Sequence, residues 1–271
     1  MAKERFITSI FNYCDYWCER CAFTRRCRNF SMGREMERQA RGEKPEDDAT
    51  RQGFWNRLAD QLVVEKMKGR DADWTDDADI DFDAEPDPEY EKREESRRKA
   101  VDEHALTKTA EAYMMKVHKW LETADKDLKS VAKEMLEAAG NKFETSDPEE
   151  DALEIGDMIE VVAWYHTLIP PKVGRAIGWL IGEDDEGGEG EVAEMIRESR
   201  LSDANGSGKV VLMAIERSIA AWVRLRDILP GQEDTILEML VLLDRLQRGI
   251  NTALPGAKSF IRPGFDEQAD R

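Results

Sequence analysis

The sequence lacks long hydrophobic runs, which argues against a membrane-spanning or secreted protein. No apolar stretch in its 271 residues approaches the roughly 20 residues that a helix needs to cross a bilayer. Residues 1–11 also lack the uninterrupted apolar stretch that a secretory signal requires. We therefore expect a protein without a membrane span, located in the reducing cytoplasm.

Histidine is scarce, and this limits the kinds of catalytic site that can be predicted. The chain has three histidines, His104, His118 and His166. A nucleophile with a neighbouring histidine and acid cannot be assembled from these positions, so the sequence gives no support for hydrolase chemistry. The segment 206–209 is Gly-Ser-Gly-Lys, but it lacks the earlier glycine of a phosphate-binding loop. We interpret this segment as a flexible entry to a helix.

Basic residues are few relative to acidic ones, and they are unevenly distributed. The chain has 40 Lys and Arg against 58 Asp and Glu, a net charge of −18. Residues 1–44 carry ten basic and six acidic side chains, whereas the remainder carries 30 and 52. Such an acidic body repels phosphate backbones and anionic lipid, so broad contact with nucleic acid or a membrane is disfavoured. The basic N-terminal segment suits an acidic protein partner.

Strand patterns are absent, and apolar residues instead recur at helical spacing. Pro170 and Pro171 are expected to end one of the predicted helices. The predicted helices cover residues 54–69, 90–140, 146–170, 172–181, 192–200, 205–229 and 231–251. Two helical hairpins joined by a long crossover predict an all-α fold containing an antiparallel four-helix bundle.

Four regions differ in composition and predict the organisation of the chain. The segment 70–89 is dense in acidic residues and contains Pro86 and Pro88, which favours a flexible loop. The predicted regions are a basic cysteine-rich metal module over 1–44, a short helix and acidic flexible loop over 45–89, a helical bundle over 90–253 and a surface tail over 254–271.

The four cysteines carry the clearest chemical signal. Their spacing is Cys14-x3-Cys18-x2-Cys21-x5-Cys27. In a reducing compartment, thiols this close together favour metal binding over a disulfide framework. On a helix, positions 14, 18 and 21 share one face, and a turn after Phe23 would return Cys27 as a fourth ligand. Tetrahedral ligation by four sulfur atoms suits zinc or an iron-sulfur cluster.

The arrangement of these cysteines in a single segment favours iron over zinc. Zinc sites more often collect their ligands as two separated pairs, whereas single-segment spacings are typical of iron-sulfur loops. We predict that Cys14, Cys18, Cys21 and Cys27 bind a 4Fe-4S cluster, with structural zinc as one alternative and redox-active or incidental thiols as another. If the four thiolates bind all four irons of a cluster, no iron is free to bind substrate. The expected roles are therefore electron transfer, redox sensing or stabilisation of the fold.

Two parts of the cysteine segment resemble known cluster motifs. Cys18-x2-Cys21-x5-Cys27 resembles the end of the 4Fe-4S loop in endonuclease III-type DNA glycosylases, which implies base excision. Cys14-x3-Cys18-x2-Cys21 is similar to the cluster motif of radical S-adenosylmethionine enzymes, which implies a barrel and one open iron site. The acidic body argues against base excision, and the helical pattern against the barrel.

Aromatic and basic residues interleave the cysteines. The aromatic residues would exclude water from a cluster or form a small core of their own. The arginines would balance thiolate charge, dock an acidic partner or form a solvated basic face. The residues concerned are Tyr13, Tyr16, Trp17 and Phe23, and Arg20, Arg25, Arg26 and Arg28.

A second metal site within the helices is also a hypothesis. Ferritin-like proteins hold two metal ions with Glu-x-x-His on two helices, a motif that this chain lacks. Glu216 is nevertheless predicted to lie on an apolar helix surface, where a carboxylate needs a partner. His166 is expected in the last turn of its helix, where free carbonyls are a second possible partner. The hypothetical second site comprises Glu111, His118, Glu160, His166 and Glu216.

The sequence thus predicts an all-α metalloprotein acting in electron transfer or redox-linked interaction with a protein partner. Two alternatives from other classes stay open. One is a helical interaction or assembly subunit stapled by zinc, and the other is a ferritin-like di-metal carboxylate protein.

Overall fold

The computed structural model of the protein describes residues 6–42, 88–139, 148–182 and 190–266, with 124–139 and 148–154 described by their backbone alone. Within these ranges the chain is all-α, with six α-helices, four short 3-10 turns and no strand. The predicted all-α class is therefore confirmed. None of the described helices is long and apolar enough to cross a membrane. The predicted helix over 54–69 and most of the acidic loop lie outside the described residues.

The chain divides into two compact units. The N-terminal unit comprises Met1–Ile7 and Cys18–Tyr90, and the helical unit comprises Thr8–Trp17 and Glu91–Arg271. In the N-terminal unit, α1 (Arg28–Ala40) follows two 3-10 turns, and the Ile7 amide donates a hydrogen bond to the Arg26 carbonyl at 3.0 Å.

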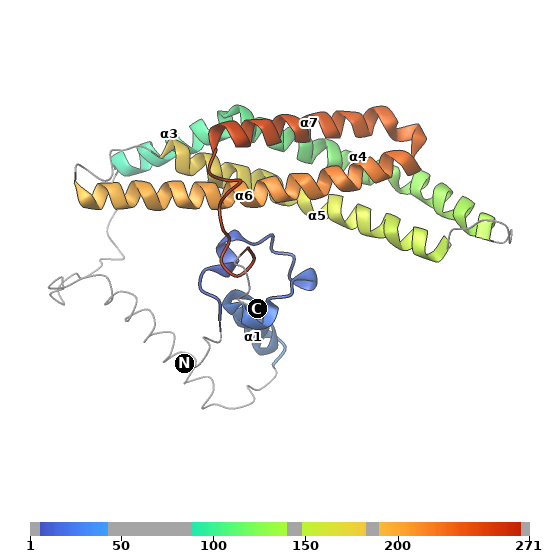
Figure 1. The fold of residues 1–271 in the computed structure, drawn as a ribbon, viewed down its shortest axis with the longest axis horizontal. Helices are drawn as coiled ribbons and strands as arrows, with labels where there is room; N and C mark the ends of the chain where they lie inside the picture. Colours follow the sequence, from blue (N-terminus) through green and yellow to red (C-terminus); the bar gives the residue numbers. More distant parts are fainter. Residues whose placement is uncertain (1–5, 43–87, 140–147, 183–189, 267–271) are drawn as a thin grey trace. The chain divides into compact units, whose positions relative to one another are not determined.

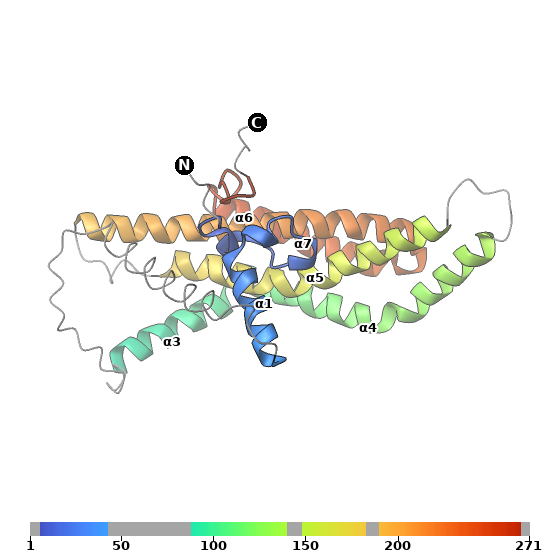
Figure 2. The same cartoon turned by 90° about the horizontal axis from the view of Figure 1, so that it is seen from below.

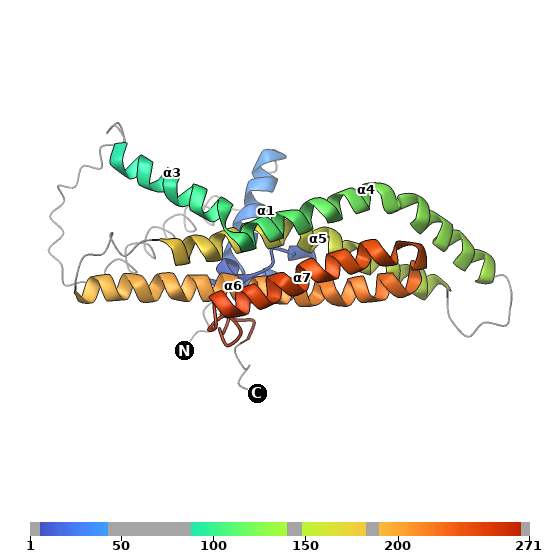
Figure 3. The ribbon, with the colours of Figure 1, turned by 90° about the horizontal axis from the view of Figure 1, so that it is seen from above.

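Four long helices make up most of the helical unit. α4 (Ala105–Ala139) packs against α5 (Pro148–Ile181) and α7 (Glu233–Ala253), and α6 (Glu191–Ile228) also packs against α5 and α7. Figure 1 shows these helices alongside one another, and Figures 2 and 3 show them from below and above. The closed ring of contacts buries one core, to which all four helices contribute.

Apolar residues at helical spacing fill this core, much as the sequence predicts. Tyr113, Trp222 and Leu243 are fully buried, and Trp120 packs edge-on against Trp222 with ring centroids 4.8 Å apart. The Trp222 indole N–H donates to the Tyr113 hydroxyl at 3.0 Å. The other buried apolar residues at helical spacing in these helices include Ala110, Val117, Ile155, Val162, Ile169, Leu212, Ile215, Ile236 and Leu246.

The predicted helix over 90–140 is two helices, α3 (Pro88–Glu103) and α4, which meet at a bend (Figures 2 and 3). His104 interrupts them, and its Nδ1 accepts a hydrogen bond from the Leu106 amide at 3.2 Å. A side chain that accepts from the first-turn amides caps a helix. His104 therefore begins α4 rather than continuing α3.

The prediction that Pro170 and Pro171 end a helix is wrong, because α5 runs through both to Ile181. Each proline removes one amide donor, so the carbonyls of His166 and Thr167 lose their helical partners. Burial of Ile169, Val173 and Ile177 in the core favours continuing the helix across this gap.

The prediction of a helix entry at 206–209 is also wrong, because α6 is continuous from Glu191 to Ile228. Gly206, Ser207 and Gly208 are buried in the interior of this helix. A Cβ on Gly206 would overlap the Tyr13 ring and lie 2.9 Å from Phe260 Cζ. The small residues therefore make room for the packing of two non-helical segments against α6.

One of those segments follows α7, where the sequence predicts a surface tail over 254–271. Leu254 and Ala257 are buried, and a Cβ on Gly208 would lie 2.9 Å from Leu254 Cδ1. The Arg262 guanidinium is also buried and donates to Asp266 at 2.8 and 2.9 Å. The start of this tail is therefore packed against the helical unit.

This packing predicts opposite effects for alanine at two helical glycines. Gly206→Ala should lower the free energy of unfolding by about 1–3 kcal/mol, because the new methyl group overlaps a ring in a close-packed site. Gly156→Ala, at an exposed site on α5 with no atom within 4 Å of the added Cβ, should raise it by up to about 1 kcal/mol. Urea unfolding of both variants measures this, and equal effects would contradict the packing described for Gly206.

Candidate metal centre

Cys18 and Cys21 lie on a tight turn of the N-terminal unit. Residues Cys18–Arg20 form a 3-10 turn, and the Cys21 amide donates to the Cys18 carbonyl at 3.2 Å. The chain then folds so that the Phe23 amide points at Cys21 Sγ, with the nitrogen 3.4 Å from the sulfur. An amide donor stabilises negative charge on a sulfur, so this turn suits a thiolate.

Cys27 lies at the beginning of a helix. It follows the 3-10 turn Thr24–Arg26, donates its amide to the Thr24 carbonyl at 3.2 Å and is the N-cap residue of α1. The amides at a helix N-terminus point toward the cap and stabilise negative charge there. The Cys27 side chain itself makes no capping hydrogen bond to these amides.

Cys14 belongs to the helical unit and follows the 3-10 turn Ile10–Tyr13. Its Sγ donates to the Phe11 carbonyl at 3.4 Å. Ser9 and Tyr16 on either side of this turn have left-handed backbone conformations, with φ of 58° and 57°. Left-handed backbone is strained for a residue as bulky as Tyr, so the surrounding contacts must hold it in place.

Asp15 provides several of these contacts. Its carboxylate accepts hydrogen bonds from the Tyr165 hydroxyl at 2.9 Å and from Arg217 Nη1 at 2.8 Å. Its backbone carbonyl accepts from the Trp164 indole at 2.9 Å. Trp17 stacks on Trp164, with centroids 5.2 Å apart, and meets Tyr165 edge-on at 5.8 Å.

A second set of polar contacts holds the segment just before Cys14. The Tyr13 hydroxyl donates to Asp203 at 3.2 Å, and Arg175 donates to the same carboxylate at 2.7 and 2.9 Å. The buried Lys172 ammonium donates to the Asn12 carbonyl at 3.3 Å. The segment Thr8–Trp17 is therefore held to α5 and α6 on both sides of Cys14.

The tyrosines of this region are held in their neutral form. Burial is the main cause that raises the pKa of Tyr165 to about 12. Burial also raises the pKa of Tyr13, and the neighbouring Asp203 carboxylate adds to that rise. Both hydroxyls can therefore act as hydrogen-bond donors to carboxylates at neutral pH.

The sequence reasoning did not identify the residues that anchor this segment. Asp15, Tyr165, Arg175, Asp203 and Arg217 come from distant parts of the chain, and no spacing in the sequence relates them. One signal in the sequence points toward such contacts. Asp15 lies between two cysteines, where its carboxylate would add negative charge to a metal site, so a cation is expected to face it.

No disulfide joins the four cysteines, and each is half-buried. Among the residues that the structure describes, no three His, Cys, Asp or Glu side chains are grouped closely enough to hold a metal ion. The four-cysteine site therefore stays a prediction that rests on residue type and spacing. The structure does not bring three of the four thiols together.

The predicted second site is not assembled by the described residues. Glu111, His118, Glu160 and Glu216 are exposed, and only His166 is buried. The placement of Glu216 on an apolar surface is therefore wrong, because it lies at the solvent side of α6, one residue beyond the buried Ile215. The rings of His118 and His166 do lie near each other, with centroids 6.3 Å apart.

The expected role of His166 at a helix end is also wrong, since α5 continues for fifteen residues beyond it to Ile181. Its Nδ1 instead lies 2.8 Å from the Ala163 carbonyl and 3.2 Å from that of Val162. Nδ1 must carry a proton to donate to either carbonyl.

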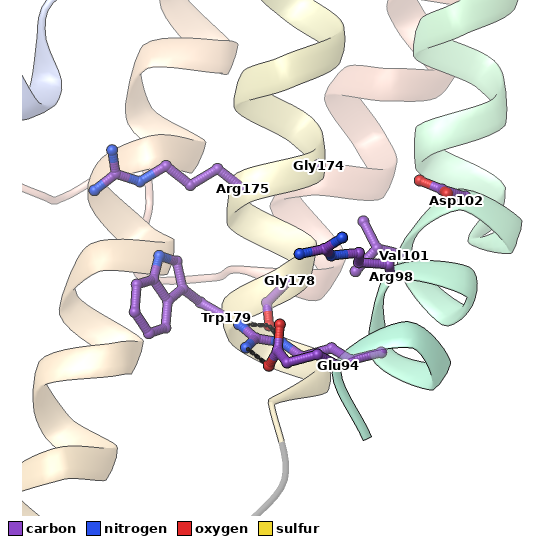
Figure 4. A pocket seen from close by; sticks show the side chains of 9 residues that line it. Glu94, Arg98, Val101, Asp102, Gly174, Arg175, Gly178 and Trp179 are labelled. Carbon is purple, nitrogen blue, oxygen red and sulfur yellow. Dashed lines mark hydrogen bonds and ion pairs between the residues drawn. The ribbon is translucent and has the colours of Figure 1, made fainter. Parts of the chain in front are cut away.

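A shallow cavity of about 450 Å³ lies between α3 and α5 (Figure 4). Arg97 donates to the Gly178 carbonyl at 3.1 and 3.3 Å and to Glu94 at 3.0 Å. A Cβ added at Gly174 or Gly178 would lie 3.9 or 3.7 Å from the Val101 side chain, an ordinary van der Waals distance. The cavity is therefore a gap beside a helix–helix contact with mixed charge on its rim.

Comparison with known proteins gives no assignment. No protein-family profile, curated protein or solved structure matches the chain.

The burial of His166 predicts a pH-dependent stability. Burial is the main cause that lowers its pKa below 6.5, and the nearby His118 adds to that effect. The unfolded chain therefore binds the proton first as the pH falls, so the folded state loses stability as the pH drops from about 6.5 through the folded pKa. The stability advantage of the wild type over His166→Gln should be larger at about pH 7.5 than at about pH 5. Urea unfolding at both pH values checks this, and an unchanged difference would contradict it.

Proposed function

We propose that the protein is a metalloprotein in which Cys14, Cys18, Cys21 and Cys27 bind a 4Fe-4S cluster. Its role would be electron transfer or redox-linked interaction with a protein partner. The observation that carries this proposal is the cysteine spacing, four thiols within fourteen residues. The proposal keeps the cytoplasmic location expected from the sequence.

The surroundings of two cysteines support this proposal. The hydrogen bond from the Phe23 amide to Cys21 Sγ is of the kind that tunes the potential of a cluster. Cys27 is the N-cap residue of α1.

The partner would be an acidic protein that contacts the basic residues of the cysteine region. Arg20, Arg25 and Arg26 are exposed on the N-terminal unit. Exposed guanidinium groups accelerate the encounter with an acidic surface and favour its carboxylates. This contact should weaken as ionic strength rises.

A second candidate is a structural zinc site in a helical interaction or assembly subunit. The turn Cys18–Cys21, followed by an amide donor to sulfur, would also serve a zinc ion, because zinc is bound by thiolates on such turns. In this case the helical unit, interpreted as an antiparallel four-helix bundle, would be the scaffold. No arrangement among the described residues favours the ferritin-like alternative.

Metal analysis of protein purified without oxygen separates these candidates. The 4Fe-4S proposal predicts about four iron and four acid-labile sulfide per chain and a brown colour. Cys18→Ser and Cys21→Ser should each lose most of the iron and sulfide, because each removes a ligand. Asn29→Ser, at an exposed position of α1, is the matched control and should retain both. About one zinc per chain without sulfide would contradict the cluster and support the second candidate.

A redox titration tests the role in electron transfer. If the cluster transfers electrons, the visible absorption of the anaerobic protein should fall on reduction with dithionite and recover on reoxidation without loss of iron. This reversibility is expected because a cluster held by four thiolates keeps its ligands in both states. A cluster that cannot be reduced, or that is lost in one cycle, would contradict electron transfer.

A further inference from the structure

The helical unit holds the backbone of Thr8–Trp17 with side chains of α5. The Trp164 indole donates to the Asp15 carbonyl at 2.9 Å, and the buried Lys172 ammonium donates to the Asn12 carbonyl at 3.3 Å. Hydrogen bonds to main-chain groups give affinity for an extended peptide without regard to its side chains. These contacts are therefore of the kind by which a protein binds a peptide.

The acid at the centre of the segment has a binding site of its own. The Asp15 carboxylate accepts from the Tyr165 hydroxyl at 2.9 Å and from Arg217 Nη1 at 2.8 Å. Arg217 also donates to the Tyr165 hydroxyl, so the three groups form one network. Only 21% of the Asp15 side chain is exposed. A carboxylate covered in this way needs such donors, and an uncharged side chain would leave them unpaired. The network therefore selects an acid.

Aromatic side chains flank this acid at a spacing of two residues. The Tyr13 ring lies where a Cβ on Gly206 of α6 would overlap it, and it meets the Phe260 ring edge-on with centroids 4.8 Å apart. Trp17 stacks on Trp164 of α5 with centroids 5.2 Å apart. Large aromatic rings contribute much of the binding energy wherever they are buried. The face therefore selects aromatic side chains at both positions.

The core of the helical unit depends little on this segment. Among the residues that the structure describes, the core is formed by α4 to α7 and the residues that follow them, and Thr8–Trp17 adds only the partly buried Trp17 at its edge. The backbones of Ser9 and Tyr16 are left-handed, with φ of 58° and 57°, which costs free energy in the docked segment. The segment can therefore leave while the helices stay folded.

We propose that this face of α5 and α6 is a peptide-binding surface, and that Thr8–Trp17 occupies it as an exchangeable intramolecular ligand. The partner is a protein segment that carries the pattern of Tyr13, Asp15 and Trp17, an acid with aromatic residues two positions away on each side. A tethered ligand acts at an effective concentration on the order of millimolar, so a partner must outcompete it. The binding requires no metal and is therefore independent of the proposed function.

A synthetic peptide of residues 8–17, labelled with a fluorophore and carrying Cys14→Ser, tests this surface on the full-length chain. The acceptor is the double variant Asp15→Ala, Trp17→Ala, whose own segment is weakened. Fluorescence anisotropy with a chelator and a thiol reductant present should show saturable binding to this variant. The wild type should bind the peptide at least about tenfold more weakly, because its own segment competes.

Replacement of one residue of the face tests its recognition of the acid. Arg217→Gln added to the double variant should raise the Kd of the peptide roughly 10–100-fold, because a hydrogen bond to a charged group is lost. Arg248→Gln, which breaks an ion pair with Asp244 on α7, is the matched control and should leave the Kd unchanged. A peptide with Asp15→Ala should also bind roughly 10–100-fold more weakly.

Two results would overturn the proposal. One is a double variant that is folded by circular dichroism but does not bind the peptide, or binds it no better than the wild type does. The other comes from hydrogen exchange of the wild type, which needs no variant. The amides of Thr8–Trp17 should exchange through an opening that leaves the buried amides of α5 and α6 protected. Exchange of both sets only on global unfolding would show that the segment is not exchangeable. Dimers of the wild type that Asp15→Ala abolishes would support the proposal and identify a second copy as the partner.

Discussion

The contact between α5 and α6 is the constraint on which the helical unit depends. It is the largest contact between two helices among the described residues, and α5 also packs against α4 while α6 packs against α7. Each large apolar side chain that is fully buried contributes about 1.5–3 kcal/mol, which offsets the backbone hydrogen bonds lost at Pro170 and Pro171. The same helices also present the side chains that hold Thr8–Trp17, among them Tyr165 and Arg217. The core therefore determines where Cys14 lies.

Helical periodicity predicted the core well because burial of one face repeats at fixed spacing. Val117, Trp222 and Leu246 each lie on the apolar face of a helix, and all three are buried. Local signals failed where tertiary packing overrides them. Two prolines predict the end of a helix within α5, but the helix continues through both. The small residues at 206–208 suggest flexibility, but they make room for Tyr13 and Phe260. Both outcomes depend on tertiary packing, which cannot be predicted without knowing which segments pack together.

The residues of the candidate site also differ in how far the sequence predicts them. Thiols are recognisable by type and spacing, so the cysteines could be proposed from the sequence alone. Contacts between distant positions, such as Asp15 with Tyr165 and Arg217, depend on the completed fold. The position of Glu216 was misjudged for a related reason, because the apolar neighbours Leu212 and Ile215 point to the core while position 216 turns outward. A stripe of apolar neighbours does not fix the direction of a residue at its edge.

The proposed function requires that the cysteines are metal ligands, and X-ray absorption of the purified protein tests this most directly. The fine structure at the edge of the bound metal reports the type, number and distance of its ligands. Ligation by the cysteines predicts sulfur neighbours at about 2.3 Å, with a nearby iron shell if the metal is a cluster. Nitrogen and oxygen neighbours alone, or protein without any metal, would contradict the account.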